Sequence, residues 1–193
     1  MLILSFPDFP QAVGLPGSYT ERPLLLQNTS SVKSSLKILD RISCHETHKV
    51  GVLYVGPGQA DDERAILSNQ FGSVRYAGFL AGLGSLLDLS EVDKATVYLG
   101  GLDHKDGDGR FAYVWQDDVM QVVFHAATLM PNLPGDPQFN KKKRHIGNDF
   151  VAIVYNESGM PYKMGTVKGQ FIYAIIVVEP LDFESNKVSC PLG

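Results

Sequence analysis

Apolar and polar positions along this chain form blocks that predict strands interleaved with helices. The run KVGVLYV, from Lys49 to Val55, is almost continuously apolar and is followed by glycine, as in a strand buried on both faces. Two later runs, FVAIVY at 150–155 and FIYAIIVV at 171–178, predict further core strands. Because such strands alternate with helices, we expect an α/β fold with a central mixed sheet flanked by helices.

Three helices are expected between these strands. A short one covers 60–69, where acids occupy the first turn, and a second covers 74–87. The second contains Gly82 and Gly84, which weaken a helix, so we expect a close neighbour at both positions. The third helix, at 117–130, has an apolar stripe made of Val119, Val122, Val123, Ala126, Ala127 and Met130.

A β-hairpin is predicted between the second and third helices. The segments ATVYLGGL at 95–102 and RFAYVW at 110–115 flank the turn-forming segment DHKDGDG. The aspartates of DHKDGDG resemble a calcium-binding loop, but the liganding positions and the closing glutamate are wrong. The segment is therefore interpreted as a hairpin tip.

The first 46 residues differ from the rest. They are rich in proline and polar residues and contain one short helical pattern at about 32–42, carried by Val32, Leu36, Leu39 and Ile42. We interpret 1–46 as a partial N-terminal subdomain and 47–193 as the main domain. The chain is expected to be a piece of a longer polypeptide.

Composition places the chain among ordinary globular proteins. Its 193 residues, 44% of them hydrophobic, are enough for one sizeable core. The net charge of −4 gives no general attraction to nucleic acid or to an anionic membrane, so recognition of phosphate needs a local patch. The sequence has two cysteines, Cys44 and Cys190, and neither a signal peptide nor a membrane span is recognisable. We therefore expect a soluble, cytoplasmic protein.

Several catalytic and ligand-binding motifs fail on spacing. VGPGQAD, after the first strand, has Asp61 where a dinucleotide fingerprint needs its third glycine, and the sequence has no GxxxxGK[ST] phosphate-binding loop. The histidines of CHETH at 44–48 are one residue too close for a zinc-binding HExxH helix, so no metal site is expected. His125, beside an apolar stripe, is typical of a packing histidine.

One segment differs from an ordinary surface loop. From Lys141 to Phe150 it reads KKKRHIGNDF, which is four cations followed by histidine, glycine and asparagine, directly before a core strand. The residues alone leave two interpretations open. The segment is either a solvated basic loop, in which Asn148 or Asp149 caps the backbone, or a functional site.

The sequence KKRHIGNDFVAIVYN resembles the signature of the Rap and tuberin class of GTPase-activating proteins. Further segments resemble the tuberin branch of this family, and together they cover most of the chain from about Thr47 to Ser185: THKVGVLYVGPGQ, AILSNQFGSVRYAGFLAGLG, VYLGGLD, DDVMQVVFHAATLMP and GTVKGQFIYAIIVVEPLDFE. A match of this length, with its motifs in order, is more specific than any single short motif. The resemblance implies a GTPase-activating domain.

In that family an asparagine side chain, the asparagine thumb, enters the nucleotide site of the bound GTPase and positions the attacking water. The resemblance places this role on Asn148. A carboxamide suits the task because it offers an acceptor for water and two donors for phosphate oxygens without carrying charge. The supporting residues and cationic contacts that the resemblance implies are His145, Arg144, Lys141, Lys142 and Lys143. An arginine finger at Arg144 is the alternative that the family argues against.

The resemblance also implies partners. The target is a Ras-family GTPase, with Rheb as the member that fits the tuberin branch. GTP and Mg²⁺ are bound by that GTPase, so the chain needs no cofactor of its own. Hamartin is implied as a partner of the full-length protein, which connects it with TOR signalling and with recruitment to endomembranes. Residues 1–46 are then an incomplete dimerisation subdomain.

Three alternatives stay open. The domain activates a GTPase of the Rap or Ral type, or it binds a GTPase without stimulating it. The third alternative is a hydrolase that uses Asp117 and Asp118, although adjacent acids at a predicted helix start are typical of a cap. An activator, by contrast, supplies a catalytic residue in trans and is not itself the enzyme.

Overall fold

The computed structural model describes residues 27–40, 45–105, 107–182 and 185–190. By its internal contacts the chain divides into two units, Met1–Cys44 and His45–Gly193. In the first unit, helix α2 (Ser30–Leu39) begins after Thr29, whose hydroxyl accepts a hydrogen bond from the Val32 N–H. The helix predicted at about 32–42 is therefore present, and Ile42 lies outside the described residues.

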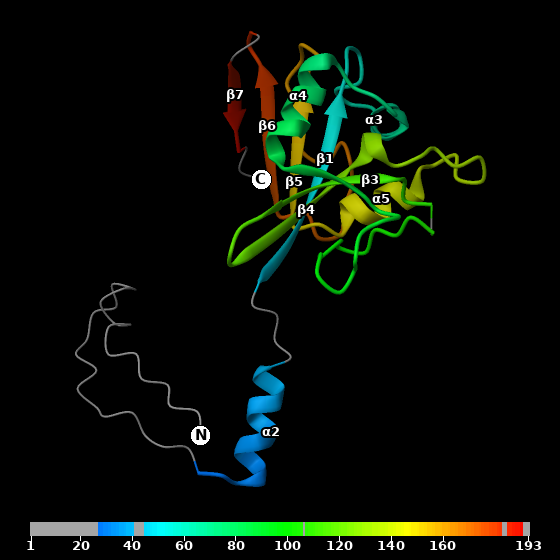
Figure 1. Cartoon of the computed structure of the whole chain (residues 1–193). Coiled ribbons are helices and arrows are strands. Elements are labelled where there is room, and N and C mark those ends of the chain that lie inside the picture. The colour runs from blue at the N-terminus through cyan, green and yellow to red at the C-terminus, as the bar shows by residue number, and fades with distance from the viewer. Residues whose placement is uncertain (1–26, 41–44, 106, 183–184, 191–193) are drawn as a thin grey trace, which may run out of the picture. The chain divides into compact units, whose positions relative to one another are not determined.

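The second unit is built on a mixed sheet (Figure 1). The described residues form seven strands in the order β2-β3-β4-β1-β5-β6-β7. β1 pairs in parallel with β4 and β5, and β5 with β6, whereas β2, β3 and β7 join by antiparallel pairing. The strands are β1 (Glu46–Val55), β2 (Ser85–Asp88), β3 (Phe111–Gln116), β4 (Met120–Ala126), β5 (Val151–Asn156), β6 (Ala174–Pro180) and β7 (Asn186–Ser189). The predicted α/β fold with a central mixed sheet is confirmed.

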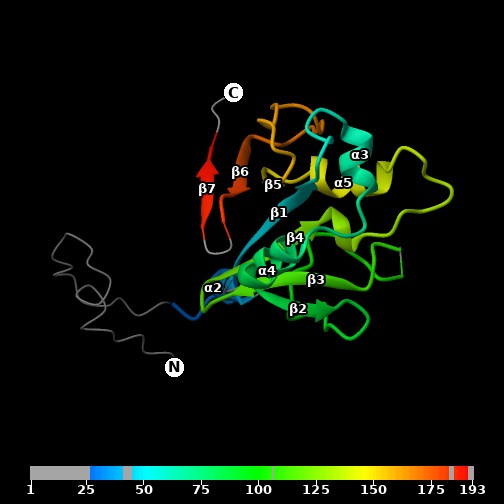
Figure 2. The same ribbon diagram turned by 90° about the horizontal axis from the view of Figure 1, so that it is seen from above.

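Helices cover both faces of this sheet (Figure 2). On one face lies α4 (Val74–Leu83), and on the other lie α3 (Glu63–Ser68) and α5 (Asn140–Gly147). A short 3₁₀ helix, η1 (Ala127–Leu129), follows β4. Within the described ranges, no helix has the length and apolar character to cross a membrane.

The core has one part on each face because side chains alternate along each strand. On the α4 face, Tyr76 and Leu80 pack against Val52 and Phe124. On the α5 face, the buried residues are Leu53, Val55, Ile66, Leu67, Ala127, Ile146, Val154, Tyr162, Val167, Ile175 and Val177. The segment between β2 and β3 completes the α5 face, where Leu99 and Leu102 pack with Val123 of β4. This segment also carries Leu99 and Asp103, whose backbone groups lie within hydrogen-bonding distance of His125 and Asp108.

The helix predicted at 117–130 is wrong, because this segment forms a turn and then β4. β4 is covered on both faces, since Phe124 packs with Tyr76 of α4 and Val123 packs with Leu99 on the other face, and the strand is therefore apolar at most positions. When most positions of a segment are apolar, some of them fall at helical spacing by coincidence, so the apolar stripe at 117–130 does not indicate a helix. Asp117 belongs to the turn, where its carboxylate accepts hydrogen bonds from the N–H groups of Val119 and Met120.

Two neighbouring predictions are also corrected. The helix predicted at 74–87 ends at Leu83, and Ser85–Asp88 instead form β2, which pairs with β3. β2 therefore takes the place that the predicted hairpin assigns to 95–102, a segment that forms no strand. The close neighbour expected at Gly84 is present, since an added Cβ would lie 2.5 Å from the Val114 carbonyl oxygen. Gly82 has no neighbour within 4 Å of such an atom, so the expectation fails there.

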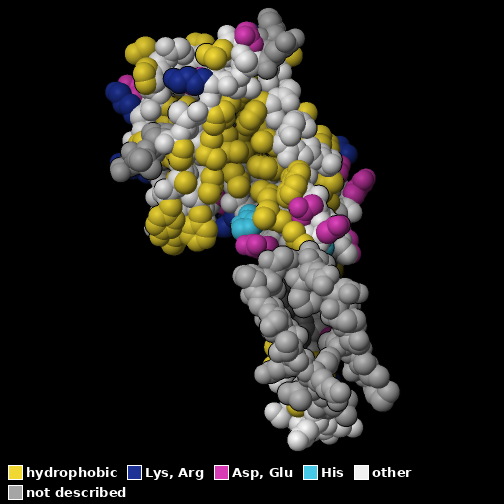
Figure 3. Space-filling model, turned by 90° about the vertical axis from the view of Figure 1, so that its left-hand side faces the viewer, with side chains coloured by type: hydrophobic (Ala, Val, Ile, Leu, Met, Phe, Trp, Pro, Cys, Tyr) yellow, Lys and Arg dark blue, Asp and Glu magenta, His cyan; other side chains and the backbone are white. Residues whose placement is uncertain are grey.

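The face that carries α4 is only partly covered. Figure 3 shows apolar side chains gathered on this side of the domain. Leu86, Trp115 and Val188 belong to outer strands and are exposed on this face. Helix α5 lies on the opposite face of the sheet.

Candidate functional site

The basic run forms helix α5, an element that the sequence does not predict. Asp136 starts this helix, because its carboxylate accepts hydrogen bonds from the N–H groups of Lys141 at 2.8 Å and Asn140 at 2.9 Å. These bonds lower the pKa of Asp136. Successive side chains on a helix point about 100° apart, so four consecutive cations cannot all face one partner.

The four cations accordingly have different surroundings. Nζ of Lys141 lies 3.5 Å from a carboxylate oxygen of Asp108, and Nζ of Lys143 lies 3.0 Å from a carboxylate oxygen of Glu63. Arg144 is exposed to solvent.

Lys142 is 2% exposed and points into the domain. Its Nζ donates to the backbone carbonyl oxygens of Leu67 at 2.9 Å and Asn69 at 3.2 Å, which attaches α5 to the end of α3. Burial lowers the pKa of Lys142 to about 8. The structure therefore does not bring Lys142 to the surface, where the predicted contact with a partner would need it.

Asn148 follows the last turn of α5 and is exposed. Its backbone N–H donates to the carbonyl oxygen of His145 at 3.2 Å, which closes the helix. The side chain takes no part in this closure, and within the described part of the chain its carboxamide has no hydrogen-bond partner. The interpretation of Asn148 as a side-chain cap therefore does not describe this geometry.

His145, three residues before Asn148, is buried and bound to a distant loop. Its Nε2 lies 2.9 Å from Oδ1 of Asp108, whose Oδ2 accepts a hydrogen bond from the Asp103 N–H at 2.8 Å. Burial lowers the pKa of His145, more than the bond to Asp108 raises it. Burial also opposes ionisation of Asp108, but its hydrogen bonds outweigh this effect and lower its pKa. His145 thus supports the helix end from inside the domain.

Asp149, directly after Asn148, is also buried and bound. Its Oδ2 lies 2.9 Å from Nδ1 of His125 on β4, and its Oδ1 lies 3.7 Å from Nζ of Lys49 on β1. The other ring nitrogen of His125 lies 3.4 Å from the Leu99 carbonyl oxygen. His125 is thus a buried, hydrogen-bonded histidine, as its sequence context predicts. Asn148 stands between two anchored residues.

An open groove of about 320 Å³ lies beside Asn148. Its lining residues are Asn140, Lys143, Arg144, Gly147, Asn148, Lys168, Gly169 and Gln170. Two glycines allow the two sides to meet, because a Cβ on Gly169 would lie 2.9 Å from the Gly147 Cα. This close approach places a third cation, Lys168, at the groove that Lys143 and Arg144 line.

Sequence reasoning missed Asp108, Lys168 and Gln170 as parts of this region. A motif in a sequence relates residues that are close along the chain. These three residues come from loops far from 141–150, so no motif connects them with that segment. Asp117 and Asp118, the pair considered for a hydrolase, lie instead in the turn between β3 and β4. Among the described residues, which exclude Cys44, no group of three or more histidine, cysteine or acidic side chains is placed to hold a metal ion.

Comparison with known proteins places the chain in a family. The model of the family described as Rap/ran-GAP matches residues 66–190. The tuberous sclerosis 2 protein homolog of Schizosaccharomyces pombe is 46% identical over 166 residues, which are 84% of this chain and 12% of that protein. Ral GTPase-activating protein subunit alpha-2 of Mus musculus is 38% identical over 157 residues, which are 81% of this chain and 8% of that protein. The chain therefore spans only a small part of the length of these relatives.

A solved structure of the TSC2 GAP domain has the same fold. It superposes with a TM-score of 0.69 at 43% sequence identity, covering 77% of this chain and 81% of that chain.

Proposed function

The chain belongs to the Rap/ran-GAP family, and we propose that it stimulates GTP hydrolysis on a Ras-family small GTPase by inserting Asn148 beside the γ-phosphate. The observation that carries this proposal is the setting of Asn148. Its carboxamide is exposed and has no hydrogen-bond partner among the described residues, while His145 and Asp149 on either side are buried and bound. A side chain that is free to bind, on a backbone held in place, suits the positioning of a reactant.

The carboxamide acts on the attacking water and on phosphate oxygens. Its oxygen accepts a hydrogen bond from the water, and its NH₂ group donates to phosphate, without adding charge near an anionic nucleotide. Phosphoryl transfer depends mainly on positioning and on compensation of developing charge, so few groups are needed from the activator. Activation of about 10⁵-fold corresponds to roughly 7 kcal/mol. One asparagine does not supply all of this, and ordering of the GTPase's own groups contributes the rest.

The cations around the groove provide the electrostatic part of the contact. Arg144 and Lys168 are exposed, Lys143 is half-buried, and all three line the groove. We assign these three, with Lys141 at the edge, to the acidic surface of the GTPase. Lys142 holds α5 to the domain instead. GTP and Mg²⁺ belong to the GTPase in this proposal, and the chain acts without a cofactor.

The target is proposed from similarity. The likeness to the tuberous sclerosis 2 protein homolog favours Rheb, and the likeness to a Ral GTPase-activating protein supports a Ral-type GTPase as the second candidate. Assembly of the full-length protein with hamartin, action in TOR signalling and a cytoplasmic or endomembrane location follow from the first choice. The dimerisation role of residues 1–46 stays a prediction.

Single-turnover GTP hydrolysis on a panel of Rheb, Ral and Rap tests the proposal. Wild type should stimulate one of them, and Asn148→Ala should remove most of the stimulation at saturation while binding to the GTP-analogue-loaded GTPase is nearly unchanged. Gln170→Ala changes a neighbouring polar side chain of the same groove and serves as the matched control. Stimulation by Asn148→Ala within about threefold of wild type, less than 1 kcal/mol of barrier, would refute the assignment.

Two further variants separate the proposed role from its alternatives. Asn148→Asp is nearly isosteric but places a carboxylate near the γ-phosphate, so it should bind the GTP-analogue-loaded GTPase more weakly than Asn148→Ala does. Arg144→Ala should weaken the complex yet leave the saturating rate mostly intact. A loss of rate at saturation with Arg144→Ala, together with an active Asn148→Ala, would identify an arginine finger instead. Tight binding without stimulation would identify a binding module.

A further inference from the structure

Three exposed aromatic side chains lie directly beside Asn148. They are Phe150, which is 59% exposed, Phe171, which is 44% exposed, and Tyr173, which is 79% exposed. We call them the aromatic platform. Large apolar side chains that gather at the surface are typical of contact sites, whereas single exposed ones are ordinary.

The members of the platform touch one another. The ring centroids of Phe150 and Phe171 are 6.4 Å apart and edge-on, and those of Phe150 and Tyr173 are 5.7 Å apart. The rings lie at the starts of neighbouring strands, since Phe150 precedes β5 and the other two precede β6. They therefore form one apolar surface and not three separate side chains.

The backbone attaches this surface to the end of α5. The Phe171 N–H donates to the Gly147 carbonyl oxygen at 3.1 Å, and the Tyr173 N–H donates to the Phe150 carbonyl oxygen at 2.9 Å. These bonds leave the platform little freedom to move relative to Asn148.

The aromatic side chains flank a residue that packs inward. Ile172 packs against the core that includes Ile146 and Val167, whereas Phe171 and Tyr173 on either side of it are exposed. The strand predicted at 171–178 in fact begins at Ala174, so the aromatic pair lies just outside the sheet.

We propose that the aromatic platform is the apolar contact for the small GTPase that Asn148 serves, packing on the protein surface next to the bound nucleotide. This inference rests on the proposed function. An asparagine side chain is short, so its backbone must come close to the GTPase when the carboxamide reaches the nucleotide. Phe150 is two residues away, and two residues of chain span at most about 7 Å. The platform is therefore carried into contact whenever Asn148 is inserted.

The platform and the groove, which both include residues next to Asn148 in the chain, have complementary tasks. The cations of the groove attract an acidic partner from a distance and set its orientation, an effect that salt weakens. Aromatic side chains supply short-range affinity by burying apolar area, and Tyr is among the residues that most often dominate binding energy. The occupant is thus a GTPase surface with an apolar patch beside its nucleotide pocket.

The test measures stimulation as a function of the concentration of the 193-residue chain, on the GTPase that responds best to wild type. The double variant Phe171→Ala/Tyr173→Ala should need a concentration about tenfold higher for half-maximal stimulation, while the saturating rate stays within about threefold of wild type. Tyr173→Phe keeps the ring and should behave as wild type does.

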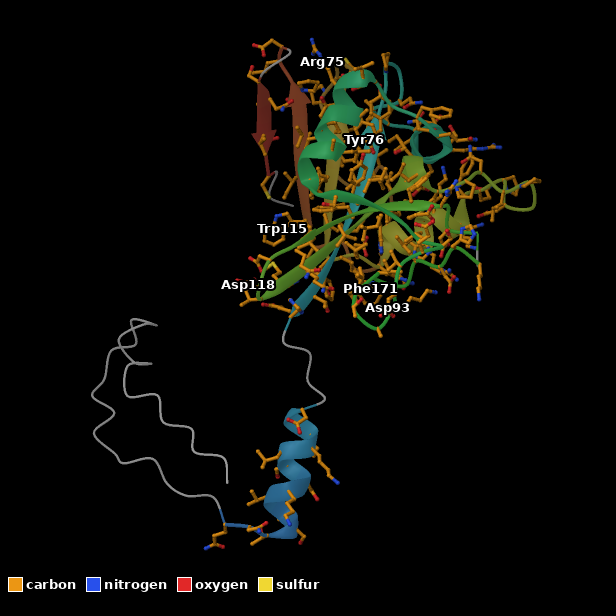
Figure 4. All side chains as sticks on the ribbon, in the orientation of Figure 1. Arg75, Tyr76, Asp93, Trp115, Asp118 and Phe171 are labelled. Carbon is orange, nitrogen blue, oxygen red and sulfur yellow. The ribbon has the colours of Figure 1, made fainter. Side chains whose placement is uncertain are left out.

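Trp115→Ala is the matched control. Trp115 is 41% exposed, comparable to Phe171, but it lies on β3 on the face of the sheet that carries α4, and Figure 4 shows the two side chains apart. The control should leave the concentration dependence unchanged. Thermal unfolding shows whether a variant is folded. Tyr173→Ser changes the most exposed ring alone and should raise the required concentration even where the double variant is unstable.

The outcomes separate this inference from the function on which it rests. If wild type stimulates no GTPase of the panel, the proposed function and the role of the aromatic platform are both refuted. If wild type stimulates and Asn148→Ala does not, but the aromatic variants match wild type, the platform alone is refuted. A lower saturating rate at an unchanged half-maximal concentration would also refute it. The inference would also be refuted if the aromatic variants abolished self-association of the chain without affecting stimulation, because the platform would then contact a second copy of the chain.

Discussion

Replacing Asp108 by alanine should destabilise the domain and loosen the end of α5 at the same time. The carboxylate accepts hydrogen bonds from Nε2 of His145 at 2.9 Å and from the Asp103 N–H at 2.8 Å, and Nζ of Lys141 lies 3.5 Å away. Asp108 is only 2% exposed. Water therefore does not replace the lost acceptor for either buried donor without further opening of the structure.

The magnitude follows from these contacts. Removing the carboxylate leaves the His145 ring nitrogen and the Asp103 N–H without their acceptor, at a cost of about 1–3 kcal/mol for each donor, and the partly exposed Lys141 adds little to this. We expect Asp108→Ala to lower the free energy of unfolding by about 3–4 kcal/mol. Asp108→Asn keeps an oxygen that can accept from His145 and loses the charge, so its cost should be about 1–2 kcal/mol.

Denaturant unfolding of wild type, both Asp108 variants, His145→Ala and the double variant Asp108→Ala/His145→Ala measures these values. The costs of the single changes should add to more than the cost of the double change, because each single change removes the same bond. At saturation, Asp108→Ala should also stimulate GTP hydrolysis more slowly than wild type, with partial recovery in Asp108→Asn. A loss below about 1 kcal/mol in Asp108→Ala, or strict additivity with His145→Ala, contradicts the reasoning.

Acid provides an independent check on the same group. The pKa of Asp108 is lower in the folded protein than in the unfolded chain, because hydrogen bonds outweigh its burial. Such a group contributes stability above the ordinary aspartate pKa of about 3.9, and this contribution is lost as the pH falls through the folded value. Wild type should therefore lose more stability than Asp108→Ala as the pH falls from about 5 to about 2. Parallel acid curves for the two proteins would show that Asp108 has no special environment.

Two further predictions concern the packing of α5 and its surroundings. Burial lowers the pKa of Lys142 to about 8, so the unfolded chain binds more protons than the folded protein above that pH, and wild type should gain up to about 1.4 kcal/mol per pH unit between about pH 8 and pH 9.5. Urea unfolding across this range should show a smaller slope for Lys142→Met, and an equal slope would mean that Lys142 is solvated. Gly169→Ala should cost about 1–3 kcal/mol in thermal unfolding, because the added Cβ would lie 2.6 Å from Ile172 and 2.9 Å from Gly147. Gly78 lies in α4, and an added Cβ there has open space, so Gly78→Ala should instead stabilise the domain by about 0.5–1 kcal/mol. A loss of stability in both glycine variants would point to a general intolerance of alanine.

The sequence predicts the fold class better than it predicts individual elements. Uninterrupted apolar runs such as 49–55 and 150–155 identify the inner parallel strands, because both faces of these strands are buried. The same property misleads at 117–130, where β4 is apolar enough to imitate a helix. Pairing partners are also missed, since nothing within 85–88 shows that this short segment pairs with β3 in place of 95–102.

Within the candidate site, whether a residue is predicted depends on how far it lies along the chain from the others. Asn148, His145 and Arg144 belong to one short segment, and their assignment to the proposed site comes from resemblance to a family. Asp108 and Lys168 come from loops that only folding brings to α5, and their sequence neighbours carry no signal. The sequence also does not show which residues of a basic run are exposed. Lys142 has cationic neighbours on both sides, but it is buried.

The bond between His125 and Asp149 has a consequence for interpreting inherited sequence changes. Gly100 has a φ of 62°, and a Cβ at this position would lie 2.7 Å from Nε2 of His125. Any larger residue there strains its own backbone and displaces the imidazole that holds Asp149. A missense change at Gly100, far from Asn148 along the chain, is therefore expected to disturb Asp149 and, through it, the backbone that carries Asn148. Weighing substitutions only by their distance from residue 148 along the chain would therefore underrate a change at Gly100.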